Sequence, residues 1–206
     1  RGTVVKASLQ DLQVTYEDKA QVNSMQAEVD LDTTFTSLQG VFIQTPNSQI
    51  KMNVRTETDV TDLLENVPIL LDIDARIGLS DIRPFYQDIP VEILNKSVDL
   101  NTKASLTKDN VNVDRLILSM PGHFSFTGNG TLASFGEMKN MSGRFKLNGE
   151  MPDVSFLESF LGEGGGITIP RKITLTAYLK VNRGHANAEI QLCPPHGCLT
   201  VDGNYH

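Results

Sequence analysis

The chain has 206 residues, of which 18 are basic and 25 acidic, and its formal net charge is -7. This length suits one large domain or two small ones, and 39% hydrophobic and 21% charged residues are ordinary globular usage, which excludes a disordered tail, a collagen-like rod and a coiled coil. The acidic balance argues against a nucleic-acid or anionic-membrane surface, because phosphate contacts need clustered Lys and Arg.

The two ends of the sequence predict that it is a piece of a longer polypeptide. It starts at Arg1 without an initiator Met or a leader pattern, and it stops at His206 directly after an alternating stretch. Its longest strongly apolar run, 67–71, is far shorter than the roughly 20 residues that a spanning helix needs. We therefore expect any membrane anchor to lie outside this segment.

Apolar residues recur at every second position along most of the chain, which is the spacing of strands with one buried face. Turn-forming residues such as Asp109-Asn110 and Pro121-Gly122 lie between several of these runs, so we expect hairpins and a mainly β fold. In chain order, strands are predicted at 25–31, 50–54, 71–77, 98–106, 116–120, 124–126, 145–147, 173–181, 188–192 and 199–205.

Two stretches, 80–88 and 151–161, interrupt the strands. In each, an acidic residue (Asp81 or Asp153) precedes apolar residues at three- and four-residue spacing, which predicts an N-capped short helix or turn. A third candidate is 58–64. These are expected to be short helical insertions between strands.

Pro-containing turns indicate a repeat. Thr45-Pro46, Met120-Pro121 and Cys193-Pro194 each follow a strand end and precede a new alternating strand, and they lie about 74 residues apart. Asp81 and Asp153 recur at a similar step. We expect one elongated β segment, 1–206, with approximate units 1–70, 71–144 and 145–206.

The two cysteines lie in the sequence Cys193-Pro-Pro-His-Gly-Cys198. A tetrahedral zinc site needs four ligands, and no second Cys or His cluster supplies the rest. On a hairpin with a four-residue turn the two cysteines face each other, within the ~5.5–6 Å Cα separation that a disulfide prefers. A structural disulfide, and with it an oxidising compartment, is favoured over a free thiol pair and over metal or redox chemistry.

No arrangement of residues predicts catalysis. The carboxylate pairs Asp72/Asp74, Asp30/Asp32 and Glu57/Asp59 have a spacing that a glycosidase or calcium site would use, but solvated charges on the polar face of a strand explain them. A catalytic triad order, a nucleophile elbow and an HExxH pattern are all missing from the sequence. We expect no enzyme, no cofactor and no metal.

The apolar faces leave two architectures open. A closed sandwich or barrel covers each apolar face with another sheet, and large aromatics usually fill such cores. Aromatics are only 6% here, so a long antiparallel sheet curled into an open groove with an aliphatic lining fits equally well. Such a groove binds acyl chains by burial, at about 0.8 kcal/mol per CH₂.

The stretch 98–132, with its alternating strand, polar turn, second strand and closing Gly-x-Gly step, resembles the repeated unit of the AsmA-like superfamily, most closely its TamB-like members. Phe145-Lys-Leu-Asn-Gly149 and 199–205 are similar to the closing step. The resemblance covers most of the chain from Leu71 and, more loosely, 4–54. The Cys-Pro-Pro-His-Gly-Cys hairpin matches no pattern of the family.

This resemblance implies a taco-shaped β-groove in the periplasm, belonging to a protein anchored in the inner membrane. It implies phospholipid acyl chains and an outer-membrane barrel of the Omp85 type as partners, and roles in phospholipid transport between the two membranes and in outer-membrane protein assembly. The alternative is a structural or adhesive β-solenoid or sandwich module that binds protein or glycan. The residues expected to line the groove are Val98, Leu100, Leu116, Leu118, Phe124, Phe126, Ile173, Leu175, Leu179, Ile190 and Leu192.

Overall fold

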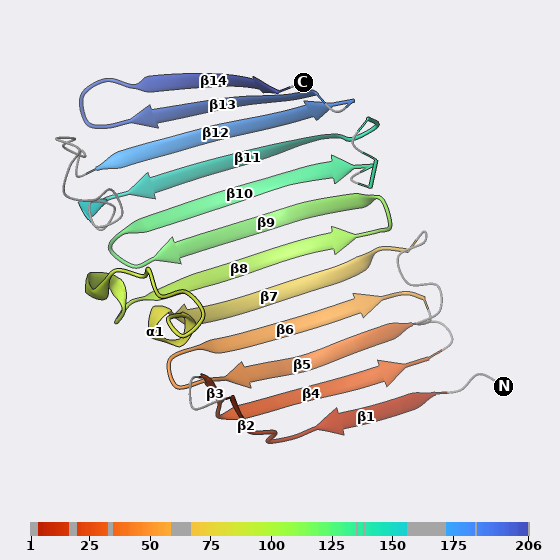
Figure 1. Cartoon of the computed structure of the whole chain (residues 1–206). Helices are drawn as coiled ribbons and strands as arrows, with labels where there is room; N and C mark the ends of the chain where they lie inside the picture. The colour runs from red at the N-terminus through yellow and green to blue at the C-terminus, as the bar shows by residue number, and fades with distance from the viewer. Residues whose placement is uncertain are drawn as a thin grey trace.

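A single large sheet dominates the molecule (Figure 1). The computed structural model describes residues 4–16, 20–32, 35–58, 67–134, 136–137, 139–155, 172–183 and 185–205. Twelve strands pair in the order β1-β4-β5-β6-β7-β8-β9-β10-β11-β12-β13-β14, all antiparallel, and β2 and β3 form a separate hairpin. The strands are β1 (Val5–Leu9), β2 (Val14–Tyr16), β3 (Ala20–Val22), β4 (Ser24–Leu31), β5 (Thr36–Gln44), β6 (Gln49–Thr56), β7 (Ile69–Gly78), β8 (Ser97–Leu106), β9 (Asn110–Met120), β10 (Phe124–Ala133), β11 (Ser142–Met151), β12 (Ile173–Asn182), β13 (His185–Cys193) and β14 (Leu199–Tyr205).

Each predicted strand is present, and several are longer than the alternation indicates. β9 begins at Asn110 and β10 continues to Ala133. Alternation does not predict β1 or β5. In β5 the pairing register shifts between Leu38 and Val41, where Gly40 has a φ of 60°. This bulge adds residues to one strand and so breaks the period of two.

The sheet is open. Its edges are β1 and β14, and neither pairs with a further strand in the described part of the chain. Apart from the β2–β3 hairpin, the described residues form no second sheet that could cover either face. The predicted curled, open antiparallel sheet with short helical insertions is therefore confirmed, and the closed sandwich or barrel is wrong.

Deeply buried side chains are few and lie mainly where insertions meet strand ends. Met120, beside the β9–β10 turn, is 2% exposed, and Val154, just after β11, is 1% exposed. Ile93 and Leu94, in the insertion between β7 and β8, are also buried. Along the strands most apolar side chains are only half-buried, so the sheet itself has no enclosed core.

The strands form three groups with the same plan: β1 with β4–β6, β7–β10, and β11–β14. In each group an insertion follows the first strand, and a Pro-containing turn joins the third strand to the fourth. These turns, the β2–β3 hairpin and helix α1 all lie on the same side of the sheet, at the ends of its strands (Figure 1). The boundaries expected at 70/71 and 144/145 fall just inside β7 and β11, and the division into repeats stays a prediction.

The insertion after β7 is tied to the Pro-containing turn of the preceding group. It contains α1 (Leu79–Ile82) and the 3₁₀-helix η2 (Val91–Ile93). The carboxylate of Asp81 accepts hydrogen bonds from the hydroxyls of Thr45 and Ser48, the second at 2.5 Å. It also accepts the backbone and side-chain N–H groups of Asn47 at 3.1 and 2.8 Å. The two carboxylate oxygens of Asp81 therefore fix a turn that belongs to another group of strands.

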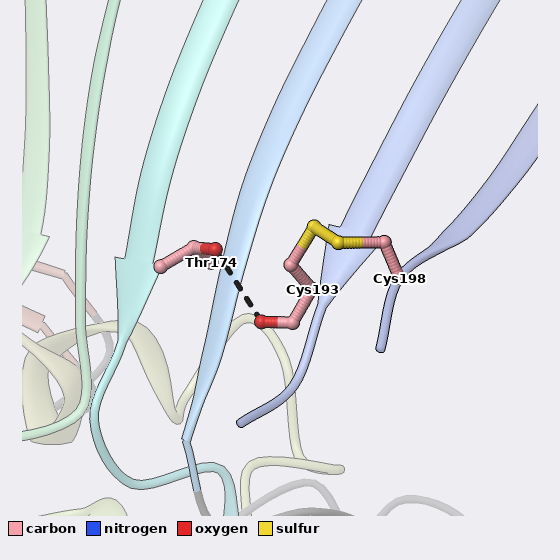
Figure 2. Close-up of a disulfide and its surroundings, with 3 residues drawn as sticks. All are labelled: Thr174, Cys193 and Cys198. Carbon is pink, nitrogen blue, oxygen red and sulfur yellow. Dashed lines mark hydrogen bonds between the residues drawn. A yellow bond between two sulfur atoms is a disulfide. The ribbon is translucent and has the colours of Figure 1, made fainter. Parts of the chain in front are cut away.

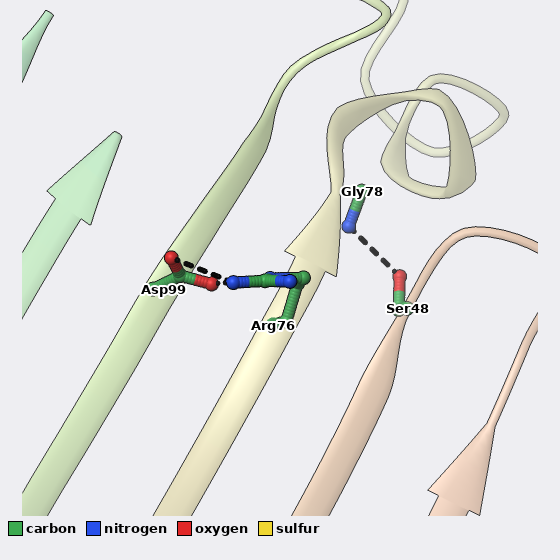
Figure 3. A network of polar contacts seen from close by, with 4 residues as sticks. All are labelled: Ser48, Arg76, Gly78 and Asp99. Carbon is green, nitrogen blue, oxygen red and sulfur yellow. Dashed lines mark hydrogen bonds and ion pairs between the residues drawn. The ribbon is translucent and has the colours of Figure 1, made fainter. Parts of the chain in front are cut away.

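The same turn is fixed from the end of β7. The hydroxyl of Ser48, a buried side chain, accepts a hydrogen bond from the backbone N–H of Gly78 at 3.0 Å (Figure 3). A Cβ at Gly78 would lie 2.5 Å from the Cβ of Asn47, which is closer than two side chains can approach. Gly78 is thus required because two segments of backbone meet there.

The predicted capping role of Asp81 is wrong. The N-cap of α1 is Gly78, which has no side-chain hydrogen bond, and Asp81 lies inside the helix. Asp153 does accept the backbone N–H of Ser155 at 3.0 Å, and its other carboxylate oxygen lies 3.7 Å from Nδ1 of His123 in the β9–β10 turn. The rest of the second stretch, from 156, and of the third candidate, from 59, lies outside the described residues.

We predict that Asp81→Asn weakens the tie between the insertion and the turn. Burial alone would raise the pKa of Asp81, but the hydrogen bonds from Ser48, Thr45 and Asn47 outweigh it and lower the pKa below its ordinary value. Such a carboxyl stabilises the fold above its unfolded pKa, near 4, and loses that effect as pH falls through the folded pKa.

The expected result is a free energy of unfolding about 1–2 kcal/mol lower than wild type at neutral pH, with a difference that shrinks as the solution is acidified below the folded pKa. Urea midpoints of the two proteins, measured from neutral to acid pH, check it. An offset that stays constant over this range would contradict the assigned role of the carboxylate.

Candidate functional site

One face of the sheet is apolar across the whole series of strands. The register places Leu100 opposite Leu118, and further along the sheet Leu175 opposite Leu192. Because side chains alternate between faces, every residue in register with these rows points to the same side. We call this side the apolar face. All the residues predicted to line a groove lie on it: Val98 and Leu100 in β8, Leu116 and Leu118 in β9, Phe124 and Phe126 in β10, Ile173, Leu175 and Leu179 in β12, and Ile190 and Leu192 in β13.

No layer formed by the described residues covers the apolar face. Leu179, Ile190 and Val201 are 41%, 37% and 49% exposed, although each lies in a row of apolar cross-strand neighbours. Phe124 and Phe126 contact each other, with ring centroids 5.1 Å apart. Contiguous exposed apolar surface of this extent is unusual for a soluble protein and marks a binding surface.

Glycines shape the middle of this face, and the sequence reasoning above did not find them. In the β10–β11 pair, each of four successive rows on the apolar face joins one glycine to one large side chain. The sequence does contain a signal for them: Gly128 and Gly130 are two residues apart, so both lie on the same face of a strand. The rows are Gly128 with Leu147, Gly130 with Phe145, Leu132 with Gly143, and Phe126 with Gly149.

The large side chains in these rows lie flat over the glycines. A Cβ added at Gly130 would come within 2.5 Å of Cδ2 of Phe145, and one at Gly149 would overlap the ring of Phe126. The glycines therefore give the rings room to lie along the sheet instead of standing up from it. This produces a low, smooth apolar floor between β9 and β12.

A hollow of about 240 Å³ opens over this floor. Four adjacent strands line it, and apart from Thr131 and Arg144, which point to the other side, its lining belongs to the apolar face. Phe145 and Leu179, which lie directly opposite each other, both line it. The lining residues are Val111, Val113, Gly130, Thr131, Leu132, Gly143, Arg144, Phe145, Leu179 and Val181.

The opposite, polar face carries the charges. Arg76 on β7 pairs with Asp99 on β8 at 2.7 Å (Figure 3), and Asp99 raises the pKa of Arg76 by this hydrogen bond and by its charge. Asp72 pairs with Lys103 at 3.1 Å, and Asp74 accepts a hydrogen bond from Asn101. The Asp72/Asp74 pair thus belongs to cross-strand charge ladders of the solvent side.

Cys193 and Cys198 form a disulfide across the β13–β14 turn, with their Cα atoms 4.1 Å apart (Figure 2). The carbonyl of Cys193 accepts a hydrogen bond from the hydroxyl of Thr174 at 3.3 Å, which fixes this end of β13 to β12. Within the described residues, no group of three or more His, Cys, Asp or Glu side chains has an arrangement that could hold a metal ion.

Comparisons with known proteins identify no relative of this chain. No protein-family model, curated protein or solved structure matches the chain. The resemblance to AsmA-like proteins therefore stays a prediction. Among the described helices, none is long and apolar enough to cross a membrane.

We predict that Gly149→Ala destabilises the protein through the apolar floor. The new methyl group would overlap the ring of Phe126, which has to leave its position over β11. Forced repacking of this kind costs about 1–3 kcal/mol, read as a lower urea midpoint.

The matched control is Gly203→Ala on β14. Gly203 also faces the apolar side, opposite Ala188, but a Cβ there would meet no atom within 4 Å. Its midpoint should stay at or slightly above that of wild type, because alanine restricts the unfolded chain more than glycine. Equal losses in the two variants would show that ring overlap is not the cause.

Proposed function

We propose that this protein holds lipid acyl chains against its apolar face. The observation that carries the proposal is the continuous apolar ladder from β1 to β14, left half-exposed and without a covering layer in the described part of the chain. Acyl chains supply the missing layer. They need no catalytic group, and each buried CH₂ contributes about 0.8 kcal/mol.

The geometry of the face suits a flexible, unbranched ligand. The flat rings of Phe126 and Phe145 over their glycines leave a floor without projecting side chains. The hollow beside Leu179 gives an acyl chain a place of closer contact. Polar groups that would fix one orientation of a small molecule are missing from the lining, which favours chains that vary in length and position.

The setting of this activity follows from the resemblance to TamB-like members of the AsmA-like superfamily. We propose that the chain is a periplasmic segment of an envelope protein anchored in the inner membrane outside this segment. In that setting the groove shields phospholipid acyl chains on their way between the inner and outer membranes. An outer-membrane barrel of the Omp85 type is the proposed partner, and support of outer-membrane protein assembly is the second part of the proposed role.

Lipid extraction tests the proposal directly. Protein purified without detergent should carry phospholipid that mass spectrometry identifies, in an amount that rises with added phospholipid vesicles and then saturates. Protein that carries none, and that takes up no fluorescent acyl probe, would remove the basis of the proposal. It would favour the structural or adhesive module, which predicts binding of protein or glycan instead.

We predict that Leu179→Asp abolishes lipid binding and leaves the fold intact. Leu179 is already 41% exposed and lines the hollow, so a carboxylate there stays hydrated while it repels an acyl chain. The matched control is Thr176→Asp on the polar side of β12. Far-ultraviolet circular dichroism should be unchanged in both, and acyl-probe binding should be lost only in Leu179→Asp.

A further inference from the structure

We propose a second binding site, for a ligand bearing phosphate groups, on the polar face behind the acyl hollow. Its centre is a cluster of three cations, Arg144 and Lys146 on β11 and Lys180 on β12. They line an open hollow of about 950 Å³. Its three cations point away from the acyl-binding face, although the lining of the hollow also includes five residues of that face, Val113, Gly130, Gly143, Phe145 and Leu179. The proposal does not depend on acyl binding.

The register brings the three cations together. Arg144 lies directly opposite Lys180, and Lys146 follows two residues later on the same side of β11, opposite Tyr178. Directly opposed side chains have Cβ atoms about 5 Å apart, and two residues along a strand span about 7 Å. The charged groups thus surround an area the size of one or two phosphate groups. The sequence contains no basic run, so only strand pairing reveals the cluster.

The cluster combines facing like charges with a lack of ion pairs. Like charges also face each other at Lys103 with Arg115 and at Glu189 with Asp202, but Lys103 has Asp72 as an ion-pair partner at 3.1 Å. Arg144 and Lys180 face each other directly, an arrangement that destabilises a strand pair. None of the three cations forms an ion pair with another described residue. In a chain with more acidic than basic residues, this points to an anion from outside.

The walls of the hollow supply neutral donors and little negative charge. Asn129 lies opposite Lys146 and Thr131 opposite Arg144 on β10. Asp114 is the one carboxylate among the lining residues, and the side-chain amide of Asn112 donates a hydrogen bond to it at 2.6 Å. The ammonium group of Lys146 lies 5.3 Å from the centre of the Tyr178 ring, which holds it over the hollow.

A bulge in β9 lies beside the hollow. The β9–β10 register shifts between Gly128 and Gly130, so that Asn129 has no partner on β9, and the β8–β9 register shifts beside Ala104. Such bulges increase local twist and redirect side chains, and they are frequent next to binding sites. Here both register shifts come from one extra residue of β9, around Asp114, which lines the hollow.

The chemistry selects a phosphate-bearing ligand. A guanidinium group offers paired N–H donors that match two oxygens of one phosphate, and ammonium groups on either side add charge. Three cations and a wide hollow favour two linked phosphates over one. The source of the phosphate is either a soluble molecule or a lipid headgroup at a membrane surface, and these are separated below.

The test uses sodium pyrophosphate as the soluble probe, at constant ionic strength. We expect the wild-type melting temperature to rise with pyrophosphate and not with the equivalent sodium chloride, and calorimetric titration to give saturable binding. The double variant Arg144→Gln/Lys180→Gln should bind about tenfold or more weakly. Without ligand its melting temperature should be equal to or higher than that of wild type, because the repulsion between the opposed cations is gone.

The matched control is Lys51→Gln/Arg55→Gln, which removes two exposed cations from the polar side of β6. It changes the net charge equally and should keep pyrophosphate binding. Wild-type protein that responds to pyrophosphate and chloride alike, or equal losses in the two double variants, would overturn the proposal.

Sedimentation with phosphatidylcholine vesicles, with and without phosphatidic acid, separates the two sources. Binding only to vesicles with phosphatidic acid, lost in Arg144→Gln/Lys180→Gln, assigns the site to lipid headgroups. Pyrophosphate binding without vesicle binding assigns it to a soluble phosphate ligand. Failure of both, with acyl-probe binding intact, overturns this site and leaves the proposed function untouched.

Discussion

The structure depends on one constraint: every strand keeps its apolar residues in register with those of its neighbours, although no second layer of the described residues packs on top of them. Most domains bury such a face against a second layer. Here a single layer extends from β1 to β14, so cross-strand contacts and backbone hydrogen bonds carry the stability. The described parts of the insertions lie at strand ends, where Met120 and Val154 are buried. The uncovered apolar ladder therefore limits the stability of this fold, and it is also the surface available for binding.

The sequence was sufficient wherever a strand keeps strict alternation, because period two reports directly on which face is buried. It failed at β5, where the bulge at Gly40 shifts the register. It also assigned Asp81 to a local helix cap, whereas the carboxylate bonds to a turn 33–36 residues earlier. Local patterns cannot reveal partners of that kind. The predicted lining residues share one face for the same reason that the strands were predictable, but the glycine rows and the Arg144–Lys180 pair depend on which strands are neighbours.

The two faces of strands β9–β12 carry different features, although they share the same backbone. On one side the glycines lower the surface under Phe126 and Phe145. On the other side the same strands gather cations around a wide hollow. Both features require a sheet whose two faces are open, because in a sandwich the second sheet would cover one of the two faces. The bulge in β9 shifts its pairing with both β8 and β10, and such a bulge increases the local twist of the backbone that both faces share.

Asp81 and Asp153 each contact a turn that precedes them in the sequence. Two of the three Pro-containing turns, β5–β6 and β9–β10, are contacted by a carboxylate that comes later in the sequence, after the strand that follows the hairpin. A hairpin that has paired one residue out of register presents its turn in the wrong place and does not receive the carboxylate. Each of these two carboxylates therefore favours the native register of the hairpin that it contacts over a shifted one.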